Sequence, residues 1–227
     1  MKQICPHCNE EKRLGIHWVQ SSECDYPQYT EQQDDIVKGL LMGDAYLRYK
    51  DKAKNPYLAV AMINEKFLKY LDNIFGPLTN GVSMKTKAEK SAEYTESHEF
   101  GNGDDGEYHD VYVLRFRSHP HLHKYVSWYD SGSKVFPDDL QLTKDVVRMW
   151  YVCDGGMRWG TDWPYVTFYS KNEYHRIEKW IDKIRSLGFD CHKTNEGFEI
   201  PYRCLDTFFE WLGEAPAGFE YKWGVEK

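Results

Sequence analysis

The chain carries two copies of one short pattern, and this internal duplication limits what it can fold into more than any other feature. The first copy spans residues 35–44 and the second spans residues 145–154. In both copies apolar residues recur at helical spacing, and both end in an aspartate, Asp44 or Asp154. A pattern repeated this closely predicts two helices in two copies of one structural unit.

The residues around each copy also correspond. Thr30 and Gln33 predict a capping box at the start of the first helix, and Thr143 predicts the N-cap of the second. Strand and helix patterns then follow in the same order, which predicts an α-β-β-α-β(β)-α arrangement for each half. The expected segments are 46–52, 57–63, 67–75, 111–117 and 119–129 in the first half, and 157–159, 165–170, 174–187, 197–200 and 202–212 in the second.

The composition excludes disorder and a membrane-spanning segment. The 227 residues are 41% hydrophobic and 16% aromatic, which is more apolar surface than a disordered chain carries. The sequence has no long apolar run and no signal-peptide pattern, so we expect an unexported, cytoplasmic protein with no membrane partner. We expect three regions, at residues 1–29, 30–140 and 141–227.

The first of these regions is rich in cysteine. Cys5 and Cys8 form a C-x2-C turn, and His17 and Cys24 complete the four N/S ligands that tetrahedral zinc requires, with His7 as a possible substitute for His17. The alternatives are a redox dithiol, which normally sits in a βαβ pattern that is absent here, or plain buried cysteines. We therefore predict a structural Zn²⁺ in a small knuckle that depends on the metal to fold.

The helix pair also suggests a second metal site. Gly39 and Gly43 would let the first motif helix approach the second closely, with Cys153 as the small counterpart of Gly43. Asp44 and Asp154 would then meet at one end of the pair. Paired carboxylates suit Mg²⁺, and Mg²⁺ between carboxylates and phosphates is the setting for phosphodiester hydrolysis. The alternative is that both aspartates are ordinary turn residues.

Residues 36–47 and 142–156 resemble the paired motifs of the LAGLIDADG homing endonucleases, in their single-chain, I-SceI-like branch. The resemblance covers about residues 30–223. It implies an α+β fold of two αββαββα halves, related by a pseudo-twofold axis and packed through the motif helices, with saddle-shaped sheets over the DNA major groove. It also implies a monomeric, Mg²⁺-dependent nuclease from an intron or other mobile element, which cuts both strands of a long, mostly asymmetric duplex DNA target and leaves short 3′ overhangs.

The family pattern assigns roles to individual residues. Asp44 and Asp154 match its metal-binding catalytic aspartates, and Lys134 and Lys222 match its one lysine per half near the attacking water. Cys153 departs from the pattern, because many members have an acidic residue there. A second departure concerns glutamines on the first strand of each half, whose places are taken approximately by Val60 and Tyr169.

DNA recognition is expected from cations on the strands that read base edges. Alternation along residues 111–117 places Arg115 and Arg117 on one face with Val111 and Val113. For any single cation the alternative is a solvated surface charge. The candidates are Arg48, Lys50, Lys52, Lys85, Lys87, Arg115, Arg117, Arg158, Lys171, Lys193 and Arg203.

The net charge of −7 is the wrong sign for a uniformly basic DNA-binding surface. Acidic residues cluster at 93–110, an expected loop, and at 210–226, so a basic face can coexist with an acidic exterior. Acidic composition is frequent in halophilic proteins, and we hypothesise a source with high intracellular salt, where base contacts supply more of the affinity. The cysteine-rich region can extend the DNA footprint through Lys12, Arg13, His17 and Trp18, or act only as a docking appendage, since nearby acidic residues offset its cations.

Two other functions use the same features. A catalytically inactive DNA-binding regulator or an RNA maturase would share the fold, but neither needs acidic groups facing phosphates. An adaptor in which the larger part is only a scaffold does not account for the duplicated motif.

Overall fold

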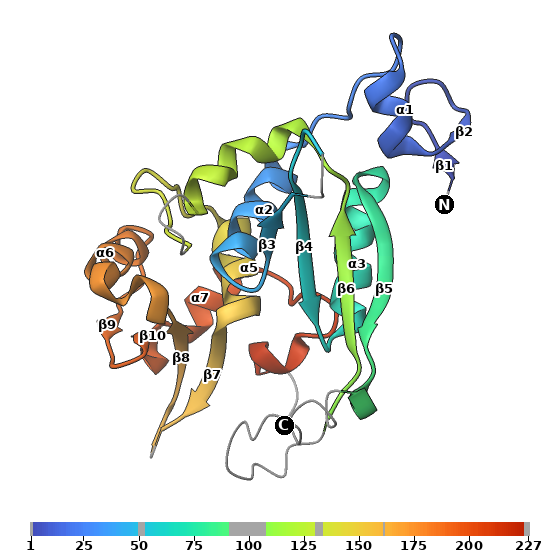
Figure 1. Cartoon of the computed structure of the whole chain (residues 1–227). Helices are drawn as coiled ribbons and strands as arrows, with labels where there is room; N and C mark the ends of the chain where they lie inside the picture. The colour runs from blue at the N-terminus through green and yellow to red at the C-terminus, as the bar shows by residue number, and fades with distance from the viewer. Residues whose placement is uncertain (1, 50–52, 91–107, 130–133, 161, 225–227) are drawn as a thin grey trace. The chain divides into compact units, whose positions relative to one another are not determined.

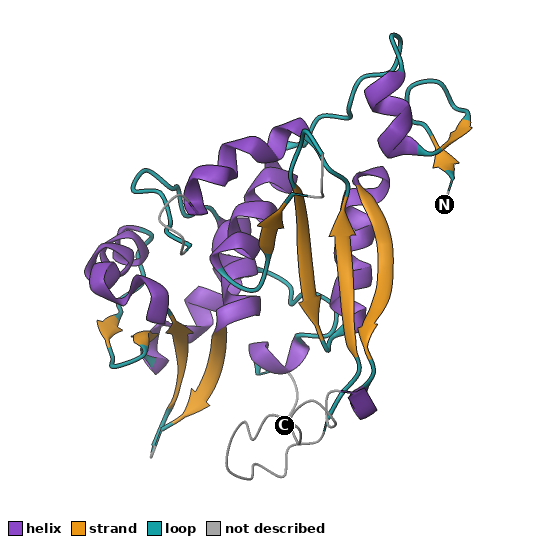
Figure 2. Cartoon of the chain, in the orientation of Figure 1, coloured by secondary structure: helices purple, strands orange, loops and turns teal. Residues whose placement is uncertain are grey.

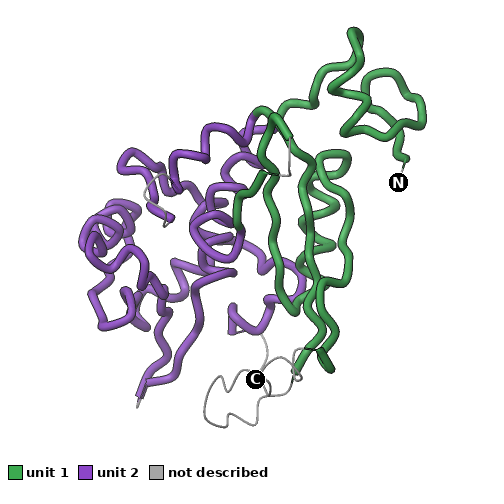
Figure 3. The backbone as a smooth tube through the Cα atoms, viewed as in Figure 1, with its two compact units in different colours: residues 1–28, 46–120 green, residues 29–45, 121–227 purple. Residues whose placement is uncertain are grey.

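The computed structural model describes residues 2–49, 53–90, 108–129, 134–160 and 162–224. Its contacts group the chain into two compact units (Figure 3), residues 1–28 with 46–120 and residues 29–45 with 121–227. Each unit is therefore built from two separate stretches of chain, and the first motif helix belongs to the unit that contains the second. The predicted acidic loop lies almost entirely outside the described residues, as do Lys50 and Lys52.

Unit 1 contains a four-stranded antiparallel sheet with strand order β3-β4-β6-β5 (Figures 1 and 2). Helix α3 covers one face of this sheet. Asn64 caps its N-terminus by accepting a hydrogen bond from the N–H of Phe67, and Phe75 packs edge-on against Phe116 at 4.6 Å between ring centroids. The bounds are β3 Tyr46–Arg48, β4 Tyr57–Met62, α3 Glu65–Phe75, η1 Gly76–Leu78, β5 Thr79–Thr86 and β6 Val111–Phe116.

The N-terminal segment of unit 1 has a small core of its own, formed by Cys5, Leu14, Trp18 and Cys24. It comprises β1 (Gln3–Ile4), β2 (Glu11–Lys12) and α1 (Leu14–Gln20). Four buried side chains are a small core, and a segment of this size needs an additional source of folding energy.

Unit 2 contains the second four-stranded antiparallel sheet, in the order β7-β8-β10-β9. Both sheets thus place their first, second, fourth and third strands side by side, which confirms the duplication at the level of topology. The bounds are α2 Glu31–Met42, η2 Pro120–Tyr129, α5 Lys144–Asp154, β7 Gly155–Trp159, β8 Pro164–Tyr169, η3 Lys171–Arg176, α6 Ile177–Ser186, β9 His192–Lys193, β10 Gly197–Ile200, η4 Tyr202–Cys204, α7 Leu205–Leu212 and η5 Glu220–Trp223.

An aromatic core joins α5 to the second sheet. Trp150 of α5 is fully buried and lies 4.8 Å from Phe168 and 5.6 Å from Phe198 between ring centroids. Trp180 of α6 contacts the same tryptophan at 6.2 Å. Burial of several large rings on one face of the sheet fixes that face as the inner one and orients α5 above it.

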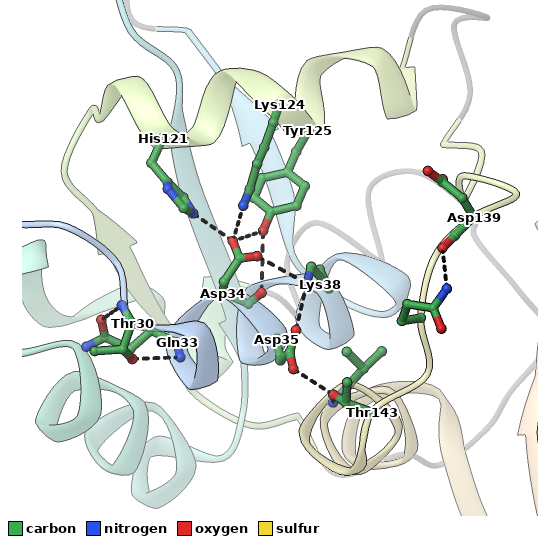
Figure 4. Close-up of polar contacts among 12 residues, drawn as sticks. Thr30, Gln33, Asp34, Asp35, Lys38, His121, Lys124, Tyr125, Asp139 and Thr143 are labelled. Carbon is green, nitrogen blue, oxygen red and sulfur yellow. Dashed lines mark hydrogen bonds and ion pairs between the residues drawn. The ribbon is translucent and has the colours of Figure 1, made fainter. Parts of the chain in front are cut away.

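The start of α2 is held by a cluster of polar side chains around Asp34 (Figure 4). The Asp34 carboxylate accepts hydrogen bonds from three side chains of η2 and from one of its own helix: His121 at 2.6 Å, Lys124 at 2.5 Å, Tyr125, and Lys38 at 3.1 Å. Burial alone would raise the pKa of Asp34, but these partners outweigh it and hold the pKa well below its usual range.

A second contact ties α2 to α5 at the same end. The Asp35 carboxylate accepts a hydrogen bond from the Thr143 hydroxyl at 2.8 Å, and Thr143 in turn accepts one from the N–H of Val146, so it caps α5 (Figure 4). The predicted Thr143 N-cap and the capping box of Thr30 and Gln33 are both confirmed. Among the described residues, no helix is long and apolar enough to cross a membrane.

Candidate active site

The two motif helices, both in unit 2, approach each other through glycine. A Cβ atom at Gly39 would lie 2.4 Å from the carbonyl oxygen of Val146, and one at Gly43 would lie 2.1 Å from the Cβ of Cys153. A side chain at either position would clash with atoms that cannot move away, so the approach of α2 to α5 depends on both glycines. The predicted roles of Gly39 and Gly43, and of Cys153 as the facing small residue, are confirmed.

The two aspartates of the duplicated pattern come together at the C-terminal ends of these helices. Asp154 is the last residue of α5, and Asp44 follows Gly43, the C-cap of α2. A carboxylate at a helix C-terminus faces the negative end of the helix dipole and is unfavourable there. Helix stability therefore does not explain either residue.

Each motif helix end also binds one lysine ammonium group. Lys134 Nζ donates a hydrogen bond to the carbonyl oxygen of Gly43 at 2.6 Å, and Lys222 Nζ donates to those of Val152 at 2.7 Å and Gly155 at 2.5 Å. Carbonyl oxygens at a helix C-terminus have no intrahelical donor, so these contacts satisfy them. The structure brings all four predicted catalytic residues into one site.

The charges in this site interact with one another. Burial and the neighbouring charge of Asp44 raise the pKa of Asp154 to about 6, against an opposing effect of the two lysines. Burial also raises the pKa of Asp44, although its outer side is open to solvent; the two lysines and a hydrogen bond with Cys153 oppose the shift. Burial lowers the pKa of Lys134 and Lys222.

This electrostatic balance fits a divalent cation. Two carboxylates supply the hard oxygen ligands that Mg²⁺ prefers. Their pKa values are raised, so keeping both carboxylates ionised without a cation lowers the stability of the folded protein. Cys153 contributes a thiol beside Asp44.

A cavity of about 270 Å³ adjoins the site on the side of Asp154. Its lining includes Lys134, Tyr169 and Lys171. Lys171 is exposed and its ammonium lies 3.7 Å from the carboxylate of Glu196. The predicted DNA-binding residue Lys171 is therefore adjacent to the catalytic candidates of unit 2.

In the first sheet, strand register decides which predicted cations can face a ligand. Leu114 and Phe116 point toward α3, so Arg115 points to the opposite face, and its pairing with Ala59 places Arg48 there too. Lys85 and Lys87 are exposed on β5 and directly after it.

Two residues of the first sheet differ from expectation. Val60 pairs with Leu114 and is fully buried toward α3, so it does not lie on the face of the sheet that carries Arg115. Arg117 is half-buried and its guanidinium donates to the carbonyl oxygen of Pro77 at 2.8 Å, to Asn80 at 2.8 Å and to Gln3. Three of its five N–H donors are occupied by protein oxygens, so the guanidinium is held in place and cannot extend to a base edge.

In the second sheet, Phe168 and Phe198 mark the inner face. Arg158 lies on the opposite face, where its Nε donates to the hydroxyl of Tyr169 at 2.7 Å. Lys193 pairs with Phe198, and its ammonium lies over the ring of Tyr174 and 3.6 Å from the Glu178 carboxylate.

Lys193 is therefore directed toward the helices, and the prediction that it faces DNA finds no support in its position. The cross-strand register decides this, and the sequence around residue 193 gave no way to assign it. Arg203 is exposed in η4 and pairs with Asp190.

The predicted zinc ligands also come together. One ligand atom from each of Cys5, Cys8, His17 and Cys24 lies within 4.8 Å of the others. Burial raises the pKa of Cys5, but hydrogen bonds from the backbone of Cys8 and His7 outweigh it and lower the pKa to about 6, which favours the metal-binding thiolate. His17, and not His7, contributes the imidazole to the cluster.

Taken together, two antiparallel sheets of one topology and a carboxylate pair at the ends of packed helices define a duplicated α+β protein with a candidate metal-dependent active site. The sequence matches the LAGLIDADG DNA endonuclease family over residues 35–201. The chain belongs to this family.

One solved structure supports the fold. The homing endonuclease I-WcaI, solved bound to its DNA recognition sequence, has a TM-score of 0.72 and 14% sequence identity to this chain, and the similarity covers 92% of this chain and 91% of I-WcaI. The meganuclease I-SmaMI, solved with uncleaveable DNA, has a TM-score of 0.44 and 11% identity over 86% of this chain and 87% of its own. No curated protein matches the chain.

Proposed function

We propose that this protein is a site-specific homing endonuclease that hydrolyses both strands of duplex DNA. One observation carries the proposal: Asp44 and Asp154 lie at the ends of two packed motif helices, where helix stability disfavours them, and each faces Lys134 and Lys222. Fixed carboxylates beside fixed ammonium groups suit a phosphodiester, whose negative charge increases on the way to the transition state.

Asp44 and Asp154 are the residues that would bind Mg²⁺. When bound, Mg²⁺ supplies charge neutralisation at the phosphate and lowers the pKa of water, which makes hydroxide available as the nucleophile. Lys134 and Lys222 are held in place by helix-end carbonyl oxygens and direct positive charge toward the same point. Their contribution is electrostatic stabilisation of the phosphate and of the leaving 3′-oxygen.

The proposed partner is duplex DNA with a long and mostly asymmetric target. The faces opposite the helices carry Arg48 and Arg115 on one sheet and Arg158 on the other, and unlike side chains on the two sheets favour unlike half-sites. I-WcaI was solved bound to DNA with a fold like that of this chain. We further propose a monomeric, cytoplasmic enzyme of the I-SceI-like branch, encoded by a mobile element and leaving short 3′ overhangs.

A selection experiment tests the activity. Supercoiled plasmids that carry a library of duplex sites are incubated with the protein and Mg²⁺, and any new ends are sequenced. We expect one family of ends with 3′ overhangs, absent for Asp44→Asn and Asp154→Asn and present for Asp206→Asn, which removes an exposed charge on α7. Retained cutting by either active-site variant would overturn the assignment. Binding to one sequence without cutting would favour a regulator, and binding to RNA alone would favour a maturase.

We also propose that Cys5, Cys8, His17 and Cys24 bind one structural Zn²⁺. Three cysteines and one histidine are a usual ligand set for tetrahedral zinc, and their ligand atoms already lie together. The metal would supply folding energy that the small core around Trp18 lacks.

A further inference from the structure

A groove of about 700 Å³ lies in unit 1, where the cysteine-rich segment meets the end of the first sheet. The segment contributes Arg13, and the loop before β4 contributes Lys54. Arg117, directly after β6, lines the same groove. Its polar lining also includes Gln3, Asn55, Asn80 and Ser118.

The charge of this groove is unusual for the protein. Its described lining residues include three cations and no carboxylate, although the chain as a whole has a net charge of −7. Arg13 and Lys54 are exposed, and within the described part of the chain neither forms an ion pair. A concave patch of one sign attracts ligands of the opposite sign.

Arg117 provides the second observation. Its guanidinium is half-buried and fixed by three neutral oxygens, those of Pro77, Asn80 and Gln3. Burial lowers its pKa, and no carboxylate opposes that shift. A positive charge is therefore held in a fixed place with no anion from the described part of the chain to balance it, which is a usual property of an anion-binding site.

The rim of the groove suits a polymer better than a free anion. Ile16 and Val19 of α1 line the groove and are 53% and 67% exposed. Apolar side chains beside cations match the alternation of sugar and phosphate along a nucleic-acid backbone.

We propose that this groove binds backbone phosphates of duplex DNA, with Arg13 and Lys54 as the mobile contacts and Arg117 as the fixed one. The choice of duplex DNA rests on the proposed function. The groove would add affinity that does not depend on base sequence, and it would give the cysteine-rich segment a role in DNA binding beyond its own fold.

The test compares two double variants by fluorescence anisotropy on random-sequence duplex DNA, and on single-stranded RNA of random sequence, over a range of KCl concentrations. Arg13→Gln/Lys54→Gln removes two groove charges. Lys66→Gln/Lys69→Gln removes two exposed charges from α3, on the other face of the same sheet, and is the matched control. All four lysine and arginine side chains are exposed, so thermal unfolding should show both variants folded.

We expect the groove variant to reduce the slope of log K against log salt concentration by about 2 and to weaken binding at low salt roughly tenfold, with the control close to wild type. A groove variant that behaves like the control would overturn the proposal. A variant effect confined to single-stranded RNA would assign the groove to RNA instead. Failure of the proposed nuclease function would be seen in a different measurement. Wild-type protein would then not cleave DNA, whatever the salt dependence of DNA binding by the variants.

Discussion

The carboxylate of Asp154 lies at the end of α5, beside the charges of Asp44, Lys134 and Lys222. The duplicated pattern identifies it, because it occupies the position that Asp44 occupies in the other copy. Its protonation depends on burial and on the charge of Asp44 across the helix pair. Those are properties of the packed structure, and spacing along the chain contains no information on them.

A folded-state pKa of about 6 gives Asp154 a measurable effect on stability. Because this value is above the ordinary pKa of aspartate, the folded state binds the proton more tightly than the unfolded state does, and that stabilisation is lost as pH rises from about 4 through about 6. Without divalent metal, Asp154→Asn should therefore have a higher Tm than wild type at pH 7 and about the same Tm at pH 4. Calorimetry in a chelator checks this; a variant less stable than wild type at pH 7 would show that the carboxylate is stabilising.

Lys134 and Lys222 lower the pKa of Asp154, so their removal has an electrostatic signature. We expect Lys134→Ala to slow cleavage roughly 10²-fold, with a smaller effect on DNA affinity, and to move the acidic limb of the pH–rate profile to higher pH. Lys222→Ala should do the same. Lys183→Ala is the matched control, since Lys183 Nζ also donates to a backbone carbonyl, that of Leu140 at 2.9 Å. An unmoved acidic limb together with lost stability would identify a purely structural lysine.

At the scale of elements, the sequence predicts helices and caps that depend on neighbouring residues. It does not predict features that depend on pairing between distant segments. Helix α2 and its capping box depend on neighbours in the chain, and both were predicted. Strand β5 was not located, because Thr79–Thr86 mixes polar and apolar residues and is irregular in its pairing with β6. Residues 119–129 were expected as a helix and are a 3-10 helix over Pro120–Tyr129. The side-by-side order of strands comes from long-range pairing and was beyond prediction.

The packing of α2 on α5 gives a prediction for Gly43. In Gly43→Ala the new Cβ would lie 2.1 Å from that of Cys153, so the helices must separate. We expect a loss of about 3 kcal/mol or more in the free energy of unfolding, by overpacking of a close contact. Gly156→Ala is the control, because a Cβ at Gly156 meets no atom within 4 Å. Equal denaturation midpoints for the two variants would contradict the close approach.

The cluster around Asp34 gives a second prediction for the same helix. Asp34→Ala leaves His121, Lys124 and Tyr125 without their shared acceptor, and we expect a loss of about 2–4 kcal/mol in urea unfolding. Because the folded-state pKa of Asp34 is depressed, this stabilisation is present above the ordinary aspartate pKa and is lost as pH falls below it. The exposed Asp139→Ala should cost little. If the difference in free energy of unfolding between wild type and Asp34→Ala were as large in acid as at neutral pH, the proposed stabilisation by the ionised Asp34 carboxylate would be contradicted.

At the scale of the whole molecule, sequence halves and compact units do not coincide. The predicted halves meet at residue 140, whereas contacts place α2 and residues 121–140 with the second sheet. The reason is that the two motif helices pack on each other. Helix α2 therefore belongs to the compact unit that contains the second sheet, although it precedes the first sheet in the sequence. The acidic composition remains the basis for the prediction of a salt-adapted protein. The test is to measure DNA affinity from low to high salt: an affinity that stays constant or rises would support the prediction, and a steep fall would contradict it.

The last prediction concerns the zinc proposed for the cysteine-rich segment of unit 1. The cysteine-rich segment buries only Cys5, Leu14, Trp18 and Cys24, so its order should depend on the four-ligand cluster. Metal analysis of purified protein should return about one equivalent of zinc, and Cys8→Ser should lower it to near zero. Cys204→Ser, which removes a thiol outside the cluster, is the control.

Loss of zinc should act on one segment and leave the rest of the fold in place. Hydrogen exchange of Cys8→Ser should show lost protection in residues 2–28 and wild-type protection in the second sheet, because the aromatic core around Trp150 is in the other unit. Since the segment positions Arg13 in the cationic groove, the variant should also bind random duplex DNA with a shallower salt dependence. Full zinc content in Cys8→Ser would contradict the assignment of Cys8 as a zinc ligand. Unchanged protection of residues 2–28 in a zinc-free variant would show that the segment folds without metal.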